Sequence, residues 1–534
     1  MIAAVRALTI AVLSAAMLAC LGPAASADHT LEDLVSPDGA AQFDWDALHM
    51  SPDGQRVLFG TSDPFDPADT DTRADIYEVV GETFTRVGPG GGFCCVPRAF
   101  SLDGSHVFFQ PVETDDFDDK LVPEDRDITD DVYETHAGVT RLVSVGSLPS
   151  NGLFDATLRD TPDDGSRAYF TTEEQLVAQD TDGGYIDIYE RSPSGTRLVS
   201  TGGNGEFDVA FRRASDVGAV VVFATAEQLV AADTDTQDDL YANSGAGTEL
   251  VSTGPTSGGG GGTGVNALSP TGSRVVFSTR ERLVPEDTDG SGLDVYARAA
   301  GTTELVSTGP TSTNAAADVT FHDASEDATV VLFSTTEQLT ADHTWADIGY
   351  YRRAGATTDL IVPVDVNRAF PVTSGDGSRA FYDTHTKVLP EDTDPNLDIY
   401  QWHQGVTTRL STGPQDTDWA NPFLGGASFD GERVFFITKA RHLPEDPSPD
   451  WDVYERFQGQ TKLLTAKPSP QLGLGISIAA VSPDGTQVLI ETGQALDPAD
   501  TDANEMDAYL YTAPSAATSF GQVGRVDDFA RSAP

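Results

Sequence analysis

Short stretches rich in β-branched and aromatic residues recur along this chain, and clusters of Gly, Pro, Ser and Asp separate them. The clearest group contains Val265–Leu268, Arg274–Thr279, Asp294–Arg298 and Thr303–Thr308. The turn Ser269–Gly272 joins the first two stretches, with Pro and Gly where a tight turn needs them. Such stretches are typical of β-strands. The pattern therefore predicts four short antiparallel strands in a unit of about fifty residues.

This group of strands repeats along the chain. Nine units begin near Phe43, Val96, Leu153, Phe207, Val265, Val319, Arg368, Pro422 and Ile476. After its second predicted strand, each unit carries an acidic motif: D-x-D, three or four further residues, then D-[I/V/L]-Y, with losses in some copies. The first Asp lies at Asp69, Asp125, Asp180, Asp233, Asp287, Asp342, Asp392, Asp446 and Asp500, with spacings of 50 to 56 residues. This period predicts an all-β fold, a single β-propeller of about nine four-stranded blades.

A second motif, S-x-D-G, precedes the second strand in several units. It occurs at Ser51–Gly54, Ser101–Gly104, Ser374–Gly377, Ser428–Gly431 and Ser482–Gly485. Together with the downstream D-[I/V]-Y, it resembles the WD-like repeat of the TolB-like β-propeller family over residues 43–511. The resemblance implies the propeller fold and no particular activity. TolB-like proteins carry an additional α/β domain for which this chain has no room, so TolB's role in the cell envelope is not carried over.

The ninth unit ends at its third predicted strand, Ala508–Thr512, without a clear fourth one. The segment Thr30–Ser36 resembles the last strand of the fifth unit and has no unit of its own. We expect it to complete the ninth blade, because closing the ring removes exposed sheet edges. The propeller then spans residues 28–512, and a flexible tail spans 513–534. The acidic motifs and the inter-blade loops should share one face, with the S-x-D-G turns on the other.

The first residues, Met1–Ala27, have the features of a secretory signal peptide. The segment Leu8–Leu21 is apolar, and Ala25–Ala27 forms an A-x-A cleavage site before Asp28. Lipid attachment at Cys20 is the alternative, although the residues before it make a poor lipobox. No other apolar run is long enough to cross a bilayer. The sequence predicts a secreted or extracytoplasmic protein with no transmembrane segment.

The chain is strongly acidic. It has 84 acidic and 32 basic residues, which give a formal net charge of −52. Like charges repel, so neither nucleic acid nor an anionic membrane surface is expected as a partner. Cationic partners and metal ions remain compatible with this charge. We expect a monomer that binds a protein or glycan ligand, whose identity the sequence does not give.

The acidic motifs are the candidate metal sites. Seven copies keep three Asp residues: Asp69, Asp71, Asp75; Asp125, Asp127, Asp131; Asp180, Asp182, Asp187; Asp233, Asp235, Asp239; Asp287, Asp289, Asp294; Asp392, Asp394, Asp398; and Asp500, Asp502, Asp507. Alternate carboxylates in a turn suit calcium, which takes six to eight oxygen ligands. Asp also stabilises turns by accepting hydrogen bonds from its own backbone. The sequence leaves calcium binding and turn chemistry as two alternatives.

Cys94 and Cys95 are the only cysteines after the expected cleavage site. Export places them in an oxidising compartment, where they can form a vicinal disulfide. The ring closed by adjacent cysteines is strained, so two thiols at the start of a strand are the alternative.

Catalytic motifs give little support for an enzyme. The sequence has no G-x-S-x-G nucleophile elbow and no H-x-x-x-H pair for zinc. Acidic pairs are too numerous to locate a glycosidase pair. The favoured interpretation is a binding or scaffold module. The alternatives are an enzyme that acts on glycans or uses a quinone at an axial site, and a purely structural surface protein. Inward-facing Arg, Trp and carboxylates at the axis favour the enzyme, and a bare acidic ring favours binding.

Overall fold

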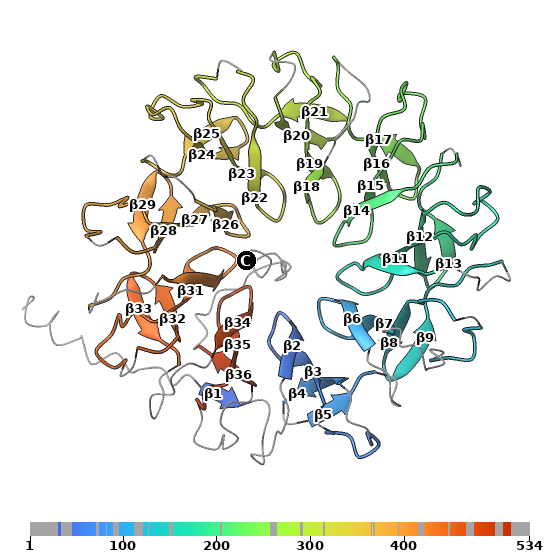
Figure 1. Ribbon diagram of the computed structural model, residues 1–534, viewed down its shortest axis with the longest axis horizontal. Coiled ribbons are helices and arrows are strands. Elements are labelled where there is room, and N and C mark those ends of the chain that lie inside the picture. The colour runs from blue at the N-terminus through green and yellow to red at the C-terminus, as the bar shows by residue number, and fades with distance from the viewer. Residues whose placement is uncertain are drawn as a thin grey trace, which may run out of the picture.

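The computed structural model is built from β-strands arranged as a ring of nine four-stranded sheets (Figure 1). It describes residues 30–33, 45–62, 64–70, 74–81, 83–88, 95–111, 121–126, 128–148, 152, 154–202, 205–256, 264–288, 292–312, 315–364, 366, 369–393, 395–414, 421–446, 449–465, 475–496 and 506–513. Each sheet is one blade, and the blades follow one another in chain order. The fold class predicted from the repeats is confirmed.

Nine strands form the inner edges of the blades, toward the axis (Figure 1). They are β2 (Trp45–Met50), β6 (Cys95–Phe100), β10 (Thr157–Asp160), β14 (Ala210–Ala214), β18 (Gly264–Leu268), β22 (Thr320–Ala324), β26 (Val372–Thr373), β30 (Phe423–Ala427) and β34 (Ile476–Val481).

The second strands are β3 (Arg56–Thr61), β7 (His106–Pro111), β11 (Ala168–Thr172), β15 (Val221–Thr225), β19 (Arg274–Thr279), β23 (Val330–Thr335), β27 (Arg379–Thr384), β31 (Arg433–Thr438) and β35 (Gln487–Thr492). The third strands are β4 (Asp75–Val80), β8 (Tyr133–His136), β12 (Asp187–Ser192), β16 (Asp239–Asn243), β20 (Asp294–Ala299), β24 (Gly349–Ala354), β28 (Asp398–His403), β32 (Asp452–Phe457) and β36 (Asp507–Thr512). Both sets are mostly buried, as the continuous apolar runs in the sequence predict.

The outermost strands are β5 (Thr83–Arg86), β9 (Val139–Leu142), β13 (Gly195–Leu198), β17 (Thr248–Leu250), β21 (Thr302–Leu305), β25 (Thr357–Leu360), β29 (Val406–Arg409), β33 (Gln460–Leu463) and, in the ninth blade, β1 (Thr30–Asp33). β1 pairs antiparallel with β36, from Thr30 opposite Thr512 to Asp33 opposite Tyr509. The N-terminal strand therefore closes the ring as predicted. It ends at Asp33, and residues 34–36 of the expected strand lie outside the described part of the chain.

Apolar side chains fill the space between consecutive blades, so each blade is stabilised by its neighbours. The same packing continues across the closure: Ala480, Leu489 and Leu510 of the ninth blade contact Val57 and Phe59 of the first. Apolar burial is worth on the order of 25 cal/mol per Å². The first and ninth blades are therefore joined by a hydrophobic core as well as by the β1–β36 pairing.

The S-x-D-G turns link adjacent blades on one face. In the turn at Ser101, the Ser Oγ donates to Asp103 Oδ1 at 2.7 Å, and Gly104 adopts a φ of 68°. The amide of Leu102 then donates to the carbonyl of Asp163 in the next blade at 2.7 Å. A left-handed φ favours Gly, which explains the last residue of the motif. The turns thus hold the blades in register with one another.

The acidic connections and the inter-blade loops meet on one face, as predicted. Thr256, in the loop between the fourth and fifth blades, donates to the carbonyls of Arg282 and Leu283, which precede the acidic motif. A Cβ on Gly254 of the same loop would lie 2.0 Å from the Leu283 carbonyl oxygen. Only Gly allows this approach of the two backbones.

We expect Gly254→Ala to destabilise the protein by about 1–3 kcal/mol, because the added methyl group overpacks against a backbone atom. Thermal unfolding followed by circular dichroism measures the effect. Gly88→Ala is the matched control, since a Cβ there meets no atom within 4 Å. Equal melting temperatures for the two variants would show that the loop moves aside at little cost.

Candidate functional site

The first Asp of the acidic motif binds the Tyr of the same motif. Tyr77 donates to Asp69 Oδ2 at 2.8 Å, and Tyr400 donates to Asp392 Oδ2 at 2.7 Å. The same bond joins Asp125 to Tyr133, Asp180 to Tyr189, Asp233 to Tyr241, Asp287 to Tyr296, and Asp446 to Tyr454. Burial, then the hydrogen bond to Asp69, raises the pKa of Tyr77, so its hydroxyl stays protonated. This bond anchors the acidic connection to the third strand.

The last Asp of the motif binds the outermost strand. In the third blade, Ser200 donates to Asp187 Oδ1 and accepts a hydrogen bond from the amide of Ile188 at 3.1 Å. The equivalent pairs are Asp131 with Ser144, Asp239 with Ser252, Asp294 with Ser307, Asp398 with Ser411, and Asp452 with Thr465. These bonds give the motif a structural role within these six blades, of the kind that turn chemistry predicts.

Two motifs bring all three carboxylates together. Ligand oxygens of Asp180, Asp182 and Asp187 in the third blade lie within 4.8 Å of one another. Asp233, Asp235 and Asp239 form the same arrangement in the fourth blade. In each cluster the first and last Asp are buried and the middle one is half-buried. Buried acidic clusters of this geometry can hold a metal ion.

The carboxylates of the third-blade cluster raise one another's pKa. Burial, together with the carboxylates of Asp180, Asp182 and Glu227, raises the pKa of Asp187 to about 7, although the Ser200 bond opposes the shift. Burial and the hydrogen bond with Asp180 also raise the pKa of Asp182. The cluster therefore favours either a proton or a bound cation at neutral pH.

Glu227 is a residue of this region that the motif analysis missed. It lies in the fourth blade, where its buried side chain accepts a hydrogen bond from the amide of Gly205. Its amide donates to Thr225 Oγ1 at 3.2 Å. The signal was present in the sequence as a repeated Thr-x-Glu after the second strand, at Glu174, Glu227, Glu281 and Glu337. This Thr-x-Glu repeat adds a carboxylate to the same face as the acidic motifs.

Other predicted site residues are only partly described. Asp71, Asp127, Asp289, Asp394, Asp500 and Asp502 lie outside the described residues. Asp75 and Asp507 begin the third strands of their blades and are buried like their counterparts. Cys94 also lies outside the described residues, and only the backbone of Cys95, at the start of β6, is described. The vicinal disulfide stays a prediction. So does metal binding by the five motifs that begin at Asp69, Asp125, Asp287, Asp392 and Asp500.

The sixth blade differs from its predicted alignment by one residue. His343, not Asp342, occupies the place of the first Asp: its amide donates to the Thr340 carbonyl and its Nδ1 bonds Tyr351. Gly349 begins the third strand where the other blades have the last Asp. The middle position is Trp345, whose ring lies 4.6 Å from that of His343. The alignment on Asp342 was wrong because the acidic residue lies one position before the structural one.

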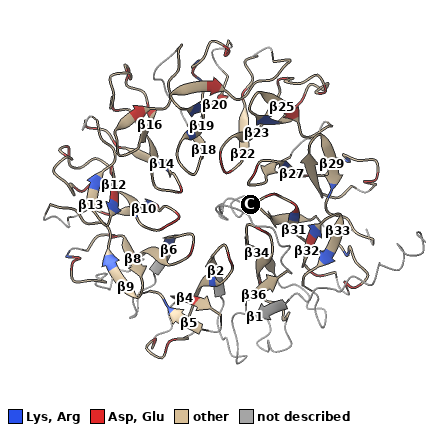
Figure 2. Ribbon diagram, turned by 180° about the vertical axis from the view of Figure 1, so that it is seen from behind, with Lys and Arg blue, Asp and Glu red and all other residues tan. Residues whose placement is uncertain are grey.

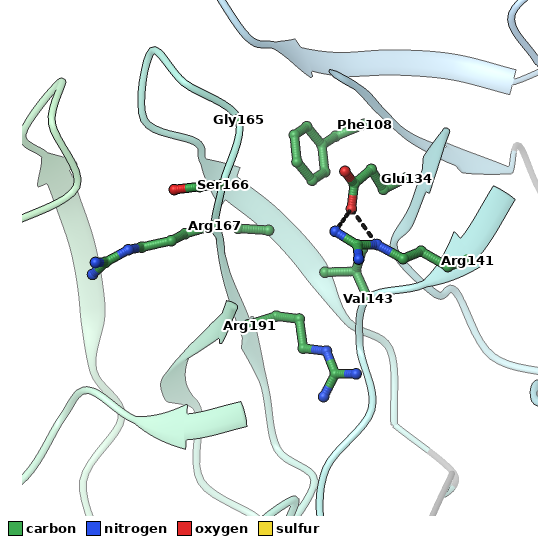
Figure 3. Close-up of a pocket in the computed structure, with 9 residues that line it drawn as sticks. Phe108, Glu134, Arg141, Val143, Gly165, Ser166, Arg167 and Arg191 are labelled. Atoms are coloured by element: carbon green, nitrogen blue, oxygen red, sulfur yellow. Dashed lines mark hydrogen bonds and ion pairs between the residues drawn. The ribbon is translucent and has the colours of Figure 1, made fainter. Parts of the chain in front are cut away.

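Charged pairs at the seams between blades lie apart from these clusters. A narrow space of about 10 Å³ between the second and third blades is lined by Arg141, Arg167, Arg191 and Glu134 among others (Figure 3). Arg141 Nε donates to the carboxylate of Glu134 at 2.6 Å. Burial alone would raise the pKa of Glu134, but His106 and Arg141 have the larger combined effect and lower it. A space of this size holds about one water molecule. It is therefore a seam and not a substrate site.

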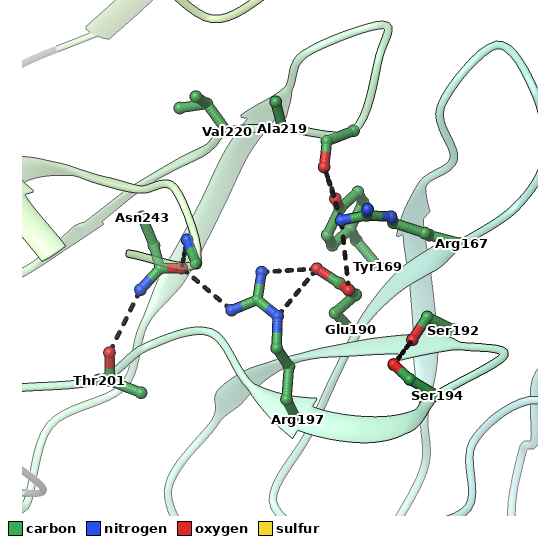
Figure 4. Close-up of polar contacts among 12 residues, drawn as sticks. Arg167, Tyr169, Glu190, Ser192, Ser194, Arg197, Thr201, Ala219, Val220 and Asn243 are labelled. Atoms are coloured by element: carbon green, nitrogen blue, oxygen red, sulfur yellow. Dashed lines mark hydrogen bonds and ion pairs between the residues drawn. The ribbon is translucent and has the colours of Figure 1, made fainter. Parts of the chain in front are cut away.

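The next seam repeats this arrangement (Figure 4). Arg197 Nε donates to Glu190 at 3.0 Å, and Arg197 Nη1 donates to Asn243 of the fourth blade at 3.0 Å. Tyr169 of the third blade donates to the Gly218 carbonyl in the fourth at 2.8 Å. These contacts have a structural role, since they join neighbouring blades. The acidic motifs are therefore the candidate metal sites.

No protein-family model and no curated protein matches the sequence. Solved structures that resemble the chain include a prolyl endopeptidase, with 14% identity, 76% of this chain covered and a TM-score of 0.36. The chain spans 55% of the length of that protein. The β-propeller domain of the Trilobed protease from Pyrococcus furiosus matches with 11% identity over 71% of this chain and 99% of its own, with a TM-score of 0.30.

The similar structures also include a TolB. The putative TolB from Agrobacterium tumefaciens has 18% identity and a TM-score of 0.24, over 60% of this chain and 94% of its own. This chain is a nine-bladed β-propeller. TolB propellers are among its structural neighbours, as the S-x-D-G and D-[I/V]-Y repeats predict. At these identities the likeness concerns the fold alone. Among the described residues, no helix is long and apolar enough to cross a membrane.

Proposed function

We propose that this protein is an exported β-propeller binding module whose third and fourth blades are stabilised by calcium. The observation that carries the metal assignment is the pair of three-carboxylate clusters in adjacent blades. Calcium prefers carboxylate and carbonyl oxygens and tolerates the irregular geometry of a loop. Outside cells it is plentiful, and a bound ion would favour the charged form of Asp187, which burial and the neighbouring carboxylates disfavour.

Export is supported by the first residues of the sequence. The A-x-A site at Ala25–Ala27 predicts a mature N-terminus at Asp28, two residues before β1 begins to pair at Thr30. An intact mass that corresponds to residues 28–534 in secreted protein would support this assignment. A diacylated Cys20 would contradict it and place the protein on a membrane.

Calcium binding is tested by isothermal titration of metal-free protein with calcium chloride. We expect at least two ions per chain, and we expect Asp182→Asn and Asp235→Asn each to remove one. Both substituted residues are only half-buried, so neither change should unfold the blade. Asp342→Asn, an exposed residue of the sixth-blade connection where His343 and Gly349 take the carboxylate positions, is the control. Absence of calcium binding, or an equal loss in the control, would refute the metal assignment.

A further inference from the structure

Two His residues face each other across the second and third strands of the second blade. His106 begins β7 and lies directly opposite His136, the last residue of β8. Their rings are stacked, with centroids 3.8 Å apart and an angle of 9° between the ring planes. His136 is exposed and His106 is half-buried, so the His pair is open to solvent. In the other eight blades, the described pairing of these two strands places no two His residues opposite each other.

In four other blades, Arg occupies the place of His106 at the start of the second strand. Figure 2 shows the Arg of β19, β27 and β31 in blue. Each of these four residues binds a Glu, in the pairs Arg56–Glu78, Arg274–Glu304, Arg379–Glu432 and Arg433–Glu455. His106 keeps this structural role, since its Nδ1 lies 2.5 Å from Glu134 Oε1. A guanidinium has only donors, whereas a neutral imidazole keeps one acceptor nitrogen. His in place of Arg therefore adds a nitrogen that can bind a metal ion.

Hydrogen bonds fix which nitrogen of each ring carries the hydrogen. The ionised carboxylate of Glu134 and the backbone carbonyl of Ser105 only accept, so His106 Nδ1 donates to the first at 2.5 Å and His136 Nδ1 donates to the second at 3.0 Å. In a neutral imidazole the lone pair then lies on Nε2. Among the described residues, neither Nε2 atom makes a hydrogen bond. Both rings of the pair therefore have an Nε2 atom that can act as a ligand.

The contacts around the His pair are those that support metal-binding His residues. The second nitrogen of such a His usually donates to a carboxylate or a backbone carbonyl, which orients the ring and makes the ligand nitrogen more basic. His106 has the carboxylate and His136 has the carbonyl. Arg141 Nε donates to Glu134 at 2.6 Å, so the carboxylate is itself held in place. A Cβ on Gly165 of the next blade would lie 2.5 Å from a ring carbon of His106, so the third blade packs closely against that ring. Both rings are therefore held in place before an ion binds.

We propose that the Nε2 atoms of His106 and His136 together bind one divalent transition-metal ion, with water in its remaining coordination positions. Imidazole nitrogen suits Cu²⁺, Zn²⁺ and Ni²⁺, and Cu²⁺ binds most tightly of the three. Calcium takes oxygen ligands, so it is not the ion of this site. Metal–nitrogen bonds of about 2.0–2.1 Å place two ligand nitrogens about 3 Å apart, so small rotations of the stacked rings bring both to one ion. This inference goes beyond the calcium role proposed above and does not depend on it.

The test is isothermal titration of the full chain with copper chloride, in excess calcium chloride so that the acidic motifs do not compete for copper. We expect one Cu²⁺ ion at the His pair, and electron paramagnetic resonance of the complex should show couplings to two imidazole nitrogens. His106→Gln and His136→Gln should each weaken this binding at least tenfold and remove one of the two couplings. His136 is exposed and lies at the end of its strand, so its substitution keeps the test valid even where loss of the His106–Glu134 bond impairs folding.

His403→Gln in the seventh blade is the matched control. His403 Nδ1 donates to the Ser378 carbonyl at 3.0 Å, as His136 does to that of Ser105, but Arg379 lies opposite His403. The copper affinity of this variant should stay within twofold of the unsubstituted chain. The proposal would be overturned if the unsubstituted chain bound no copper, if His403→Gln lost as much affinity as His136→Gln, or if the nitrogen couplings were unchanged in His136→Gln. Calcium titration of the same samples separates the two proposals, because loss of the His pair leaves the calcium count unchanged.

Discussion

Removing residues 30–33 from a chain that begins at Thr30 should lower the melting temperature by about 5 °C. A four-residue strand contributes on the order of 5 kcal/mol through net hydrogen bonding and apolar burial. Unfolding entropy of about 2.1 cal/mol/K per residue makes this close to one degree per kcal/mol for a chain of this size. The loss also exposes the edge of β36, where the buried Tyr509 and Tyr511 lie opposite β1.

The two chains differ only in β1, so differential scanning calorimetry compares them directly. A synthetic peptide of residues 28–36, added to the shorter chain, should restore part of the stability in proportion to its concentration. Equal melting temperatures without peptide would mean that the packing of Leu489 and Leu510 on the first blade closes the ring by itself.

Asp187→Asn should stabilise the calcium-free protein at pH 8 and remove the third-blade part of its response to calcium. The carboxyl group of Asp187 has a pKa of about 7 in the folded protein, above its ordinary value of 3.8. As the pH rises between these values the unfolded chain loses its proton first, so the folded state loses stability up to about pH 7. One pKa unit corresponds to about 1.4 kcal/mol, so the full penalty is a few kcal/mol. Asn cannot ionise, and it still accepts the Ser200 bond.

With calcium the difference between the two chains should narrow. An ion at the third-blade cluster, present at a hundred times its dissociation constant, stabilises the unsubstituted chain by about 2.7 kcal/mol, and the variant lacks this gain. Asp452→Asn in the eighth blade is the matched control, because Asp452 makes the same bond to Thr465 but its motif has Ser448 in the middle. Melting curves at pH 8, with and without calcium, measure how far the difference narrows. Equal stabilisation by sodium chloride at matched ionic strength would reduce the effect to screening.

The propeller was predictable because its signals are local and repeat nine times. One strand of the fifth unit follows the run of β-branched and aromatic residues from Arg274 to Thr279, where the structure has β19 with the same ends. The closing strand was predictable because Thr30 begins a copy of a fourth strand and the ninth unit lacks one. These signals come from hydrophobic periodicity and turn residues, which can be read from short stretches of sequence.

The candidate sites were less predictable, since they depend on how blades meet. Glu227 approaches the third-blade cluster from the fourth blade, and no spacing within one repeat indicates this. The sixth motif was misaligned because Asp342 matches its first position in sequence. The residue that bonds Tyr351 is the buried His343 beside it.

The register of the ring closure also sets how this protein responds to pulling. Thr30 lies opposite Thr512, so the first residue of β1 and the last residue of β36 lie at the same end of the ninth blade. A force applied between the chain ends pulls the two strands apart from the Thr30–Thr512 pair inward, so the backbone hydrogen bonds of β1 and β36 break one after another. A molecule tethered at both ends would therefore open at the ninth blade under low tension, while the eight remaining blades stay folded.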